Sequence, residues 1–281
     1  MKNPLYCSTG VFTGRVNGRN PRLAADYAAQ LDCDGLEVMV YEGWYGRLKK
    51  IAALYRERGL CCPVVHADKR IGDFMSAPSP ESWEEAHRRF EENCRFAKAI
   101  NASILVCHIW GIPESDGHLP CIIERCGRLL TIADRYGLQL AAENCVCVHG
   151  SPLRHMVELA ARYPSVGFTL DTRPAQFHRE LPDFFRSRLF TDGYIRHIHI
   201  GDYAGGYKEW ERLYPIPHPG EGEVDFPAFF SALRKSGYDG GVTLESPCIQ
   251  PDRVDTKAIR RDLEWIRCQW DAADTAGERQ Q

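Results

Sequence analysis

Four short apolar runs in the second half of the chain each end in an acidic or imidazole side chain, and this feature constrains the fold most. Each run has the length and composition of a β-strand, along which side chains alternate between two faces. In the second run, Val166, Phe168 and Leu170 share an apolar face, which suits a covering helix. Asp171 lies on the opposite face with small or polar neighbours. The four runs are residues 138–143, 166–171, 194–199 and 241–245.

These strand ends predict one rim of a parallel β/α barrel, where the carboxyl ends of successive strands meet and where such enzymes place their chemistry. The runs end in Glu143, Asp171, His199 and Glu245. We therefore expect these four side chains to converge. Three carboxylates and one imidazole suit a single divalent cation of the Mg, Mn, Co or Zn class.

The rest of the chain repeats a strand, a loop and a helix, about eight times in all. Helix start signals occur at Ser79-Pro80 and Ser151-Pro152, and Gly137 marks a helix end. Such alternation indicates a parallel sheet, and eight cycles favour its closure. We predict an α/β fold, a single-domain (β/α)8 TIM barrel over residues 1–270, followed by a frayed polar tail at 271–281. Further strands are expected near residues 5–9, 35–39, 63–66 and 103–108.

Composition excludes several classes of protein. The 281 residues slightly exceed the roughly 250 typical of a β/α barrel. A net charge of −3 gives no overall attraction to nucleic acid, and no stretch is apolar enough to predict a membrane span. The start of the sequence has no signal-peptide core. The 12 cysteines include no Cys-x-x-Cys, and we expect reduced, structural thiols in a cytoplasmic protein.

Five short motifs at these strand ends resemble those of the xylose isomerase-like barrels. That family contains sugar and sugar-phosphate isomerases, ketose 3-epimerases, hydroxypyruvate isomerases and inosose dehydratases, with type IV apurinic endonucleases as relatives. Each motif is weak alone, but their order and placement make the set specific. The motifs are 142–144 (Ala-Glu-Asn), 170–172 (Leu-Asp-Thr), 197–202 (His-Ile-His-Ile-Gly-Asp), 218–226 (His-Pro-Gly-Glu-Gly-Glu-Val-Asp-Phe) and 243–245 (Thr-Leu-Glu).

The resemblance implies a metal-dependent isomerase or epimerase of a small sugar or similar hydroxy-carbonyl compound. Glu143, Asp171, His199 and Glu245 would hold one metal ion, manganese among the candidates. Glu143 and Glu245 would also transfer the proton. Removing a proton beside a carbonyl leaves an ene-diolate, whose charge a divalent cation stabilises. Relatives include homodimers and tetramers, so a homo-oligomer is left open.

Four further residues are candidate substrate contacts. His66 and His108 end strands, where a purely structural role is the alternative. Glu37 points inward by alternation and would line the mouth or form a salt bridge. Arg173 follows Asp171 and would bind a carboxylate or phosphate, or form an exposed salt bridge. We expect His197 to be a hydrogen-bonded core residue; the loop 202–217 would form a lid or a subunit contact.

The sequence lacks two features of the metal-dependent endonucleases in this family. Many relatives carry histidine three positions after the aspartate, where this chain has Pro174, and the Asp-x-His of the endonucleases is not evident near His218. Both absences argue against a three-zinc nuclease, and we expect no nucleic acid partner. The alternatives are a keto-polyol dehydratase of the inosose type, a metal-dependent endonuclease and a non-catalytic ligand-binding barrel.

Overall fold

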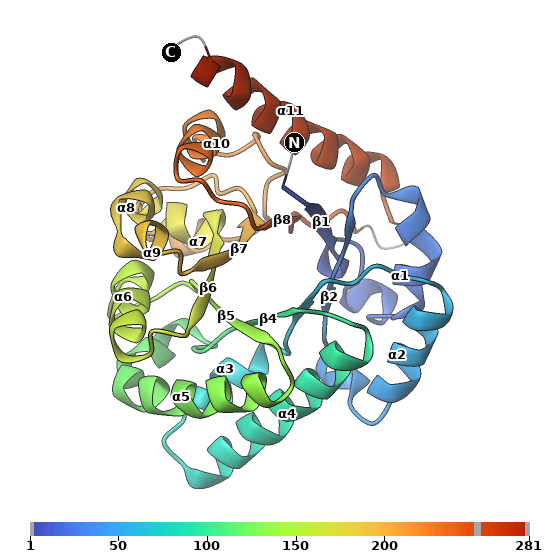
Figure 1. The fold of residues 1–281 in the computed structure, drawn as a ribbon, viewed down its shortest axis with the longest axis vertical. Helices are drawn as coiled ribbons and strands as arrows, with labels where there is room; N and C mark the ends of the chain where they lie inside the picture. Colours follow the sequence, from blue (N-terminus) through green and yellow to red (C-terminus); the bar gives the residue numbers. More distant parts are fainter. Residues whose placement is uncertain (1–2, 250–253, 279–281) are drawn as a thin grey trace.

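Eight parallel strands close into a barrel in the computed structural model of the chain, which describes residues 3–249 and 254–278 (Figure 1). Each strand pairs with the next one in the sequence, and the last pairs with the first. The predicted (β/α)8 barrel is confirmed. The strands are β1 Leu5–Ser8, β2 Gly35–Met39, β3 Val64–His66, β4 Ile104–Cys107, β5 Gln139–Glu143, β6 Gly167–Asp171, β7 Ile195–Ile200 and β8 Gly241–Leu244.

The strand faces divide as the alternation predicts. Val64, Val106 and Ala141 pack together in a small cluster separate from the main core, as inward-facing barrel residues do. Phe168 and Leu170, from the opposite face of β6, belong to the main core with the helices. The inward face is therefore left with small and polar side chains toward the strand ends, where a site can form.

An outer ring of helices covers the barrel (Figure 1). Ser79 and Ser151 cap α4 and α6 by accepting hydrogen bonds from backbone N–H groups three residues on, as predicted. The helices are α1 Arg22–Tyr27, α2 Leu48–Glu57, α3 Arg70–Ser76, α4 Pro80–Ala99, α5 Leu119–Arg135, α6 Pro152–Arg162, α7 Thr172–Phe177, α8 Leu181–Arg186, α9 Arg188–Thr191, α10 Phe226–Lys235 and α11 Thr256–Glu278.

The last helix completes the ring. It packs on α10, and Arg267 forms an ion pair with Asp32, which precedes β2. The helix also continues past the predicted boundary at residue 270. Residues 271–278 continue this helix, whereas 279–281 lie outside the described residues, and the fraying of the tail stays a prediction.

The twelve cysteines form no disulfide with one another in the structure, and most of them are buried. Burial raises the pKa of the Cys62 and Cys126 thiols to about 12, which leaves both without reactive thiolate character. Over residues 3–249 and 254–278, none of the helices has the length and apolar character needed to span a bilayer.

Candidate metal centre at the barrel mouth

The four predicted ligands meet at the carboxyl ends of β5, β6, β7 and β8. One donor atom from each of Glu143, Asp171, His199 and Glu245 lies within 4.8 Å of all the others. The Nδ1 atom of His199 is 3.3 Å from Oε1 of Glu143 and 3.4 Å from Oε2 of Glu245. Opposite ligands of an ion bonded at about 2.1 Å stand roughly 4.2 Å apart, so the cluster has the dimensions of a metal site.

The charges of this cluster also fit a cation. Of the three carboxylates, Glu143 and Asp171 are buried and the Glu245 side chain is 13% exposed; burial together with the Glu143 carboxylate raises the pKa of Asp171 to about 7. Oε1 of Glu245 is buried and accepts no hydrogen bond. A divalent ion would neutralise the crowded carboxylates and give this oxygen a partner. The donor set is that of a Mg, Mn, Co or Zn site.

Asn144 follows Glu143, and Thr172 follows Asp171. The side chains of Asn144 and Thr172 form hydrogen bonds that hold the ends of neighbouring strands together. The Asn144 side chain accepts from the backbone N–H of Asp171 at 2.5 Å and donates to its carbonyl at 2.9 Å. The Thr172 hydroxyl donates to the Gly201 carbonyl at 2.6 Å and accepts from its N–H at 3.1 Å. The third residues of the Ala-Glu-Asn and Leu-Asp-Thr motifs thus join neighbouring strands and set the spacing of the ligands.

Glu37 orients His199 from beneath. Its carboxylate is fully buried and lies 3.0 Å from Nε2 of His199 and 2.8 Å from Nε2 of His197. Burial alone would raise the pKa of Glu37, but the two imidazoles outweigh it and hold that pKa well below its usual range. Because Nε2 of His199 is occupied by Glu37, Nδ1 is the nitrogen presented to the other ligands.

Two histidines hold Glu143 from the other side. Nε2 of His108 is 2.7 Å and Nε2 of His66 is 3.1 Å from Oε2 of Glu143. Nδ1 of His66 bonds the Ala67 carbonyl at 2.8 Å. These three side chains form a second group with metal-ligand spacing, which shares Glu143 with the first. Burial opposes the negative charge of Glu143, but His108 and His199 outweigh it and keep its pKa well below the usual value.

Hydrogen bonds to Asp202 hold the glycine-rich segment 218–226, which follows β7, in a fixed conformation. Both oxygens of Asp202 accept backbone hydrogen bonds, including those of Gly220 at 2.9 Å and Gly222 at 2.8 Å. A side chain at Gly222 would meet the Asp202 carboxylate at 2.4 Å, so this approach requires glycine. The motif therefore shapes the loop beside the mouth.

Two adjoining cavities open above the ligands, with volumes of about 360 and 150 Å³. Asp171 lines both, Glu143 and His108 line the larger one, and Glu245 lines the smaller one. Three non-ligand residues also line both cavities, namely Lys69, Arg173 and Tyr214.

Comparison with known proteins identifies the family. The sequence profile of the xylose isomerase-like TIM barrels matches residues 25–269. The chain belongs to this family. A ketose 3-epimerase of Arthrobacter globiformis is 31% identical over 147 residues, which is 49% of this chain and only 46% of that enzyme. The 3-dehydro-D-guloside 4-epimerase of Escherichia coli (strain K12) is 24% identical over 256 residues, 86% of this chain and 92% of that enzyme.

A solved structure shares the same fold. The D-allulose 3-epimerase of Methylomonas sp., crystallised with D-allulose, superposes with a TM-score of 0.71 over 95% of this chain and 97% of that one. The sequence identity is 18%, so the likeness concerns the xylose isomerase-like barrel itself.

Of the predicted substrate contacts in this xylose isomerase-like barrel, two lie on the cavity wall and two do not. His108 and Arg173 line the mouth. His66 and Glu37 are instead completely buried and line neither mouth cavity, because Glu143 and His199 lie in front of them and bond to them. Their positions match the salt-bridged alternative for Glu37 and the structural alternative for His66, and a substrate contact by either residue stays a prediction. His197 is buried and bonded to Glu37 and Thr243, as expected of a core histidine.

The sequence reasoning missed Lys69 and Tyr214. Lys69 precedes α3, and the carboxylates of Glu245 and Glu143 outweigh desolvation and raise the pKa of its ammonium group. Tyr214 belongs to the long loop after β7, and the Arg173 guanidinium lies 5.6 Å from its ring centroid. The position of Lys69 after a strand-ending histidine was a usable signal, whereas nothing in the sequence singled out Tyr214.

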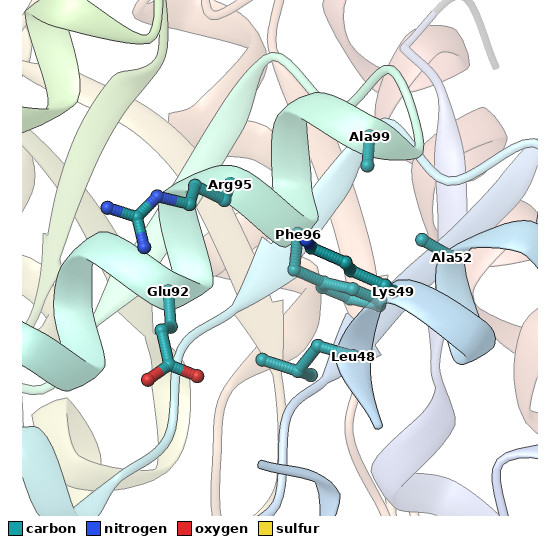
Figure 2. Close-up of a pocket in the computed structure, with 7 residues that line it drawn as sticks. All are labelled: Leu48, Lys49, Ala52, Glu92, Arg95, Phe96 and Ala99. Carbon is teal, nitrogen blue, oxygen red and sulfur yellow. The ribbon is translucent and has the colours of Figure 1, made fainter. Parts of the chain in front are cut away.

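A separate groove of about 390 Å³ lies on the outer ring, between α2 and α4 (Figure 2). Its wall is formed largely by aliphatic groups and the Phe96 ring, and Glu92 is the only carboxylate lining it. Its lining has no cluster of side chains that could bind a metal ion, so we do not assign the candidate active site to this groove despite its volume. The lining residues are Leu48, Lys49, Ala52, Glu92, Arg95, Phe96 and Ala99.

Proposed function

We propose that this protein is a divalent-metal-dependent isomerase or epimerase of a small sugar or sugar-like hydroxy-carbonyl compound. The observation that carries the proposal is the meeting of three carboxylates and one imidazole within 4.8 Å beneath a cavity at the barrel mouth. Membership of a family with sugar epimerases among its members supports it. The chemistry would proceed by proton abstraction beside a carbonyl and an ene-diolate.

Glu143, Asp171, His199 and Glu245 would hold the ion, with manganese, magnesium, cobalt and zinc as candidates. When bound, it would polarise the substrate carbonyl and stabilise the negative charge that develops on the oxygens. The protein side chains then have two tasks, which are to place the substrate over this centre and to move its proton.

The surroundings of the two glutamates suggest unequal proton roles. The Glu143 carboxylate is enclosed by the imidazoles of His66, His108 and His199, whose ring nitrogens lie 3.1, 2.7 and 3.3 Å from its oxygens. Glu245 has a carboxylate oxygen without a hydrogen bond and lines the smaller cavity. We assign proton removal to Glu245 and proton return from the opposite side to Glu143, beside His108. General acid–base assistance of this kind contributes typically about 10²–10⁴-fold.

Arg173 and His108 would orient the substrate. The backbone N–H of Arg173 donates to Oδ1 of Asp171 at 2.9 Å, and its guanidinium donates to the Leu213 carbonyl at 3.3 Å. These bonds and the Tyr214 ring hold the guanidinium at the cavity wall. Its remaining N–H groups would bind substrate oxygens.

The group formed by His66, His108 and Glu143 bears on the endonuclease alternative, because it offers ligands for a second ion. A nuclease predicts at least two tightly held metals and DNA binding that weakens steeply with salt. A dehydratase would use a similar site and release water. A cytoplasmic location, a homo-oligomer and the lack of nucleic acid binding stay predictions.

The test is proton NMR in heavy water with the manganese-treated protein, after removal of excess metal, and a panel of ketoses and keto-polyols. Incorporation of deuterium at a carbon next to the carbonyl is the expected result. Loss of water from a keto-polyol would favour the dehydratase. Binding of a sugar with no exchange and no conversion of any member of the panel would contradict the proposal.

A further inference from the structure

A third cavity, of about 320 Å³, lies beside the candidate metal centre and is lined by segments that follow β1, β2 and β3. It shares Met39, Tyr41 and Lys69 with the smaller mouth cavity, and Lys69 and Arg70 with the larger one. A ligand seated over the candidate metal ligands could therefore extend into it past Lys69.

Basic side chains dominate the wall of this cavity. Arg15, Arg19, Lys69 and Arg70 line it, against two carboxylates, those of Glu42 and Asp68. Both carboxylates are already paired. Glu42 accepts from Arg70 at 3.0 Å and from Arg89, outside the cavity lining, at 2.9 Å, and Asp68 accepts from Arg89 at 2.6 Å.

Three basic side chains on the wall thus form no direct ion pair, although the more distant carboxylates of Glu245 and Glu143 favour the charged form of Lys69. Within residues 3–249 and 254–278, Arg15, Arg19 and Lys69 have no carboxylate within ion-pair distance. Gathering like charges around one hollow is unfavourable unless an anion joins them. The cavity therefore has the charge of an oxyanion-binding site.

Arg19 is held in place for such a role. Its guanidinium carbon lies 4.9 Å from the centroid of the Tyr41 ring, and the Tyr41 hydroxyl donates to the Thr13 carbonyl at 2.8 Å. Its backbone has a φ of 50°, which is unusual for a residue other than glycine, and its carbonyl accepts from Trp44 at 2.8 Å. Nε of Arg19 is nevertheless buried without a hydrogen-bond partner. A guanidinium that is anchored on a strained backbone and has an unused donor points to a ligand.

We propose that Arg15, Arg19 and Lys69 bind an anionic group, a carboxylate or a phosphate, at the far end of the substrate chain. The inference rests on the proposed function and limits its substrate class to sugars that carry an acidic group. Lys69 would contact the chain where it passes from the metal centre into the basic cavity. Guanidinium groups match both kinds of oxyanion through paired N–H donors.

The test uses three ketoses that share one carbon framework, which are D-fructose, D-fructuronate and D-fructose 6-phosphate. Affinity is measured by isothermal titration calorimetry, and exchange of solvent deuterium into each sugar is measured on the same manganese-treated protein. The variants are Arg15→Gln/Arg19→Gln and the control Arg22→Gln, an exposed arginine that begins α1 and does not line the cavity. Thermal unfolding confirms that each variant is folded.

We expect the natural protein and Arg22→Gln to bind one of the anionic ketoses more tightly than D-fructose. The double variant should lose roughly ten- to one-hundred-fold of that preference, as expected for charge-assisted hydrogen bonds. The preference should also fall as salt is raised. Whether D-fructuronate or D-fructose 6-phosphate shows the effect identifies the anion as carboxylate or phosphate.

The two proposals fail in different ways. Equal affinity for all three sugars, or a preference that the double variant retains, overturns the anion site even if every sugar exchanges deuterium. Tighter binding of an anionic sugar that depends on Arg15 and Arg19, without exchange in any sugar, supports the anion site and overturns the proposed isomerase or epimerase chemistry.

Discussion

Replacing Glu37 by glutamine is expected to weaken divalent-metal binding although Glu37 touches no ligand atom that would face the ion. Its carboxylate lies 3.0 Å from Nε2 of His199, and the opposite nitrogen of that ring faces Glu143 and Glu245. A carboxylate in this position polarises the ring and makes its metal-binding nitrogen more basic. Glutamine keeps the shape of the side chain but removes the negative charge.

The expected size follows from burial. Outer partners of metal ligands typically contribute about 10- to 100-fold in affinity, which is about 1.4–2.7 kcal/mol. Glu37 and His199 are both fully buried, so solvent does not screen their interaction, and we expect the upper part of that range. Affinity for Mn²⁺ is measured by competition with a fluorescent chelator at pH 7.5, which reports on metal binding independently of activity.

Asp116→Asn is the matched control. Asp116 is likewise a buried carboxylate paired with a histidine, His155, at 3.3 Å, and it lies in a group of its own with Cys147 and His155. The substitution Asp116→Asn should lower the free energy of unfolding and leave the affinity for Mn²⁺ unchanged. The reasoning is refuted if Glu37→Gln binds Mn²⁺ within twofold of the natural protein, or if Asp116→Asn weakens binding equally.

Three further predictions concern the proton, the pH and the strand ends. Glu143→Gln with Mn²⁺ still bound should slow deuterium exchange at the substrate carbon by at least about 100-fold, and an unchanged rate would remove its proton role. Burial lowers the pKa of His178 to about 4, and its neutral ring accepts the Cys147 N–H at 3.0 Å. Between pH 6.5 and 4, His178 is protonated in the unfolded chain but not in the folded one. The free energy of unfolding should therefore fall as the pH decreases through this range, by at most about 3 kcal/mol. Urea unfolding of His178→Gln should show a flatter pH dependence, and an identical slope would contradict this. Thr172→Val leaves the Gly201 N–H and carbonyl without the Thr172 hydroxyl, so the free energy of unfolding, measured in urea at pH 7.5, should fall by about 1–3 kcal/mol. A change below about 0.5 kcal/mol would contradict the proposed link between the ends of β6 and β7.

Strand alternation and strand ends were sufficient to predict the barrel and the meeting of the four candidate ligands at its mouth. An acid that ends a parallel strand has few other places to go once the sheet closes, so Asp171 could be placed from the pattern alone. Alternation also places Glu37 and His66 on the inner face, but it does not give their depth. Depth depends on the shear of the closed barrel, which puts His199 above Glu37 and Glu143 in front of His66.

The loops were the least predictable part. Lys69, Arg19 and Tyr214 come from three loops after different strands, and only the closed fold brings two or more of them to one cavity. Their chemistry depends on partners far away in sequence, as with the Tyr41 ring beneath the Arg19 guanidinium. A local sequence pattern does not predict contacts between residues that are far apart in the sequence.

The number of tightly bound divalent ions per chain tests the central claim most directly. After dialysis against a weak chelator, elemental analysis of the Mn²⁺-loaded protein should give one ion per chain, and Asp171→Asn/Glu245→Gln should give close to none. A full equivalent retained by that double variant would show that the ion lies elsewhere. Two or more ions held by the natural protein would contradict a single-ion centre and would bring the His66, His108 and Glu143 group into the metal site.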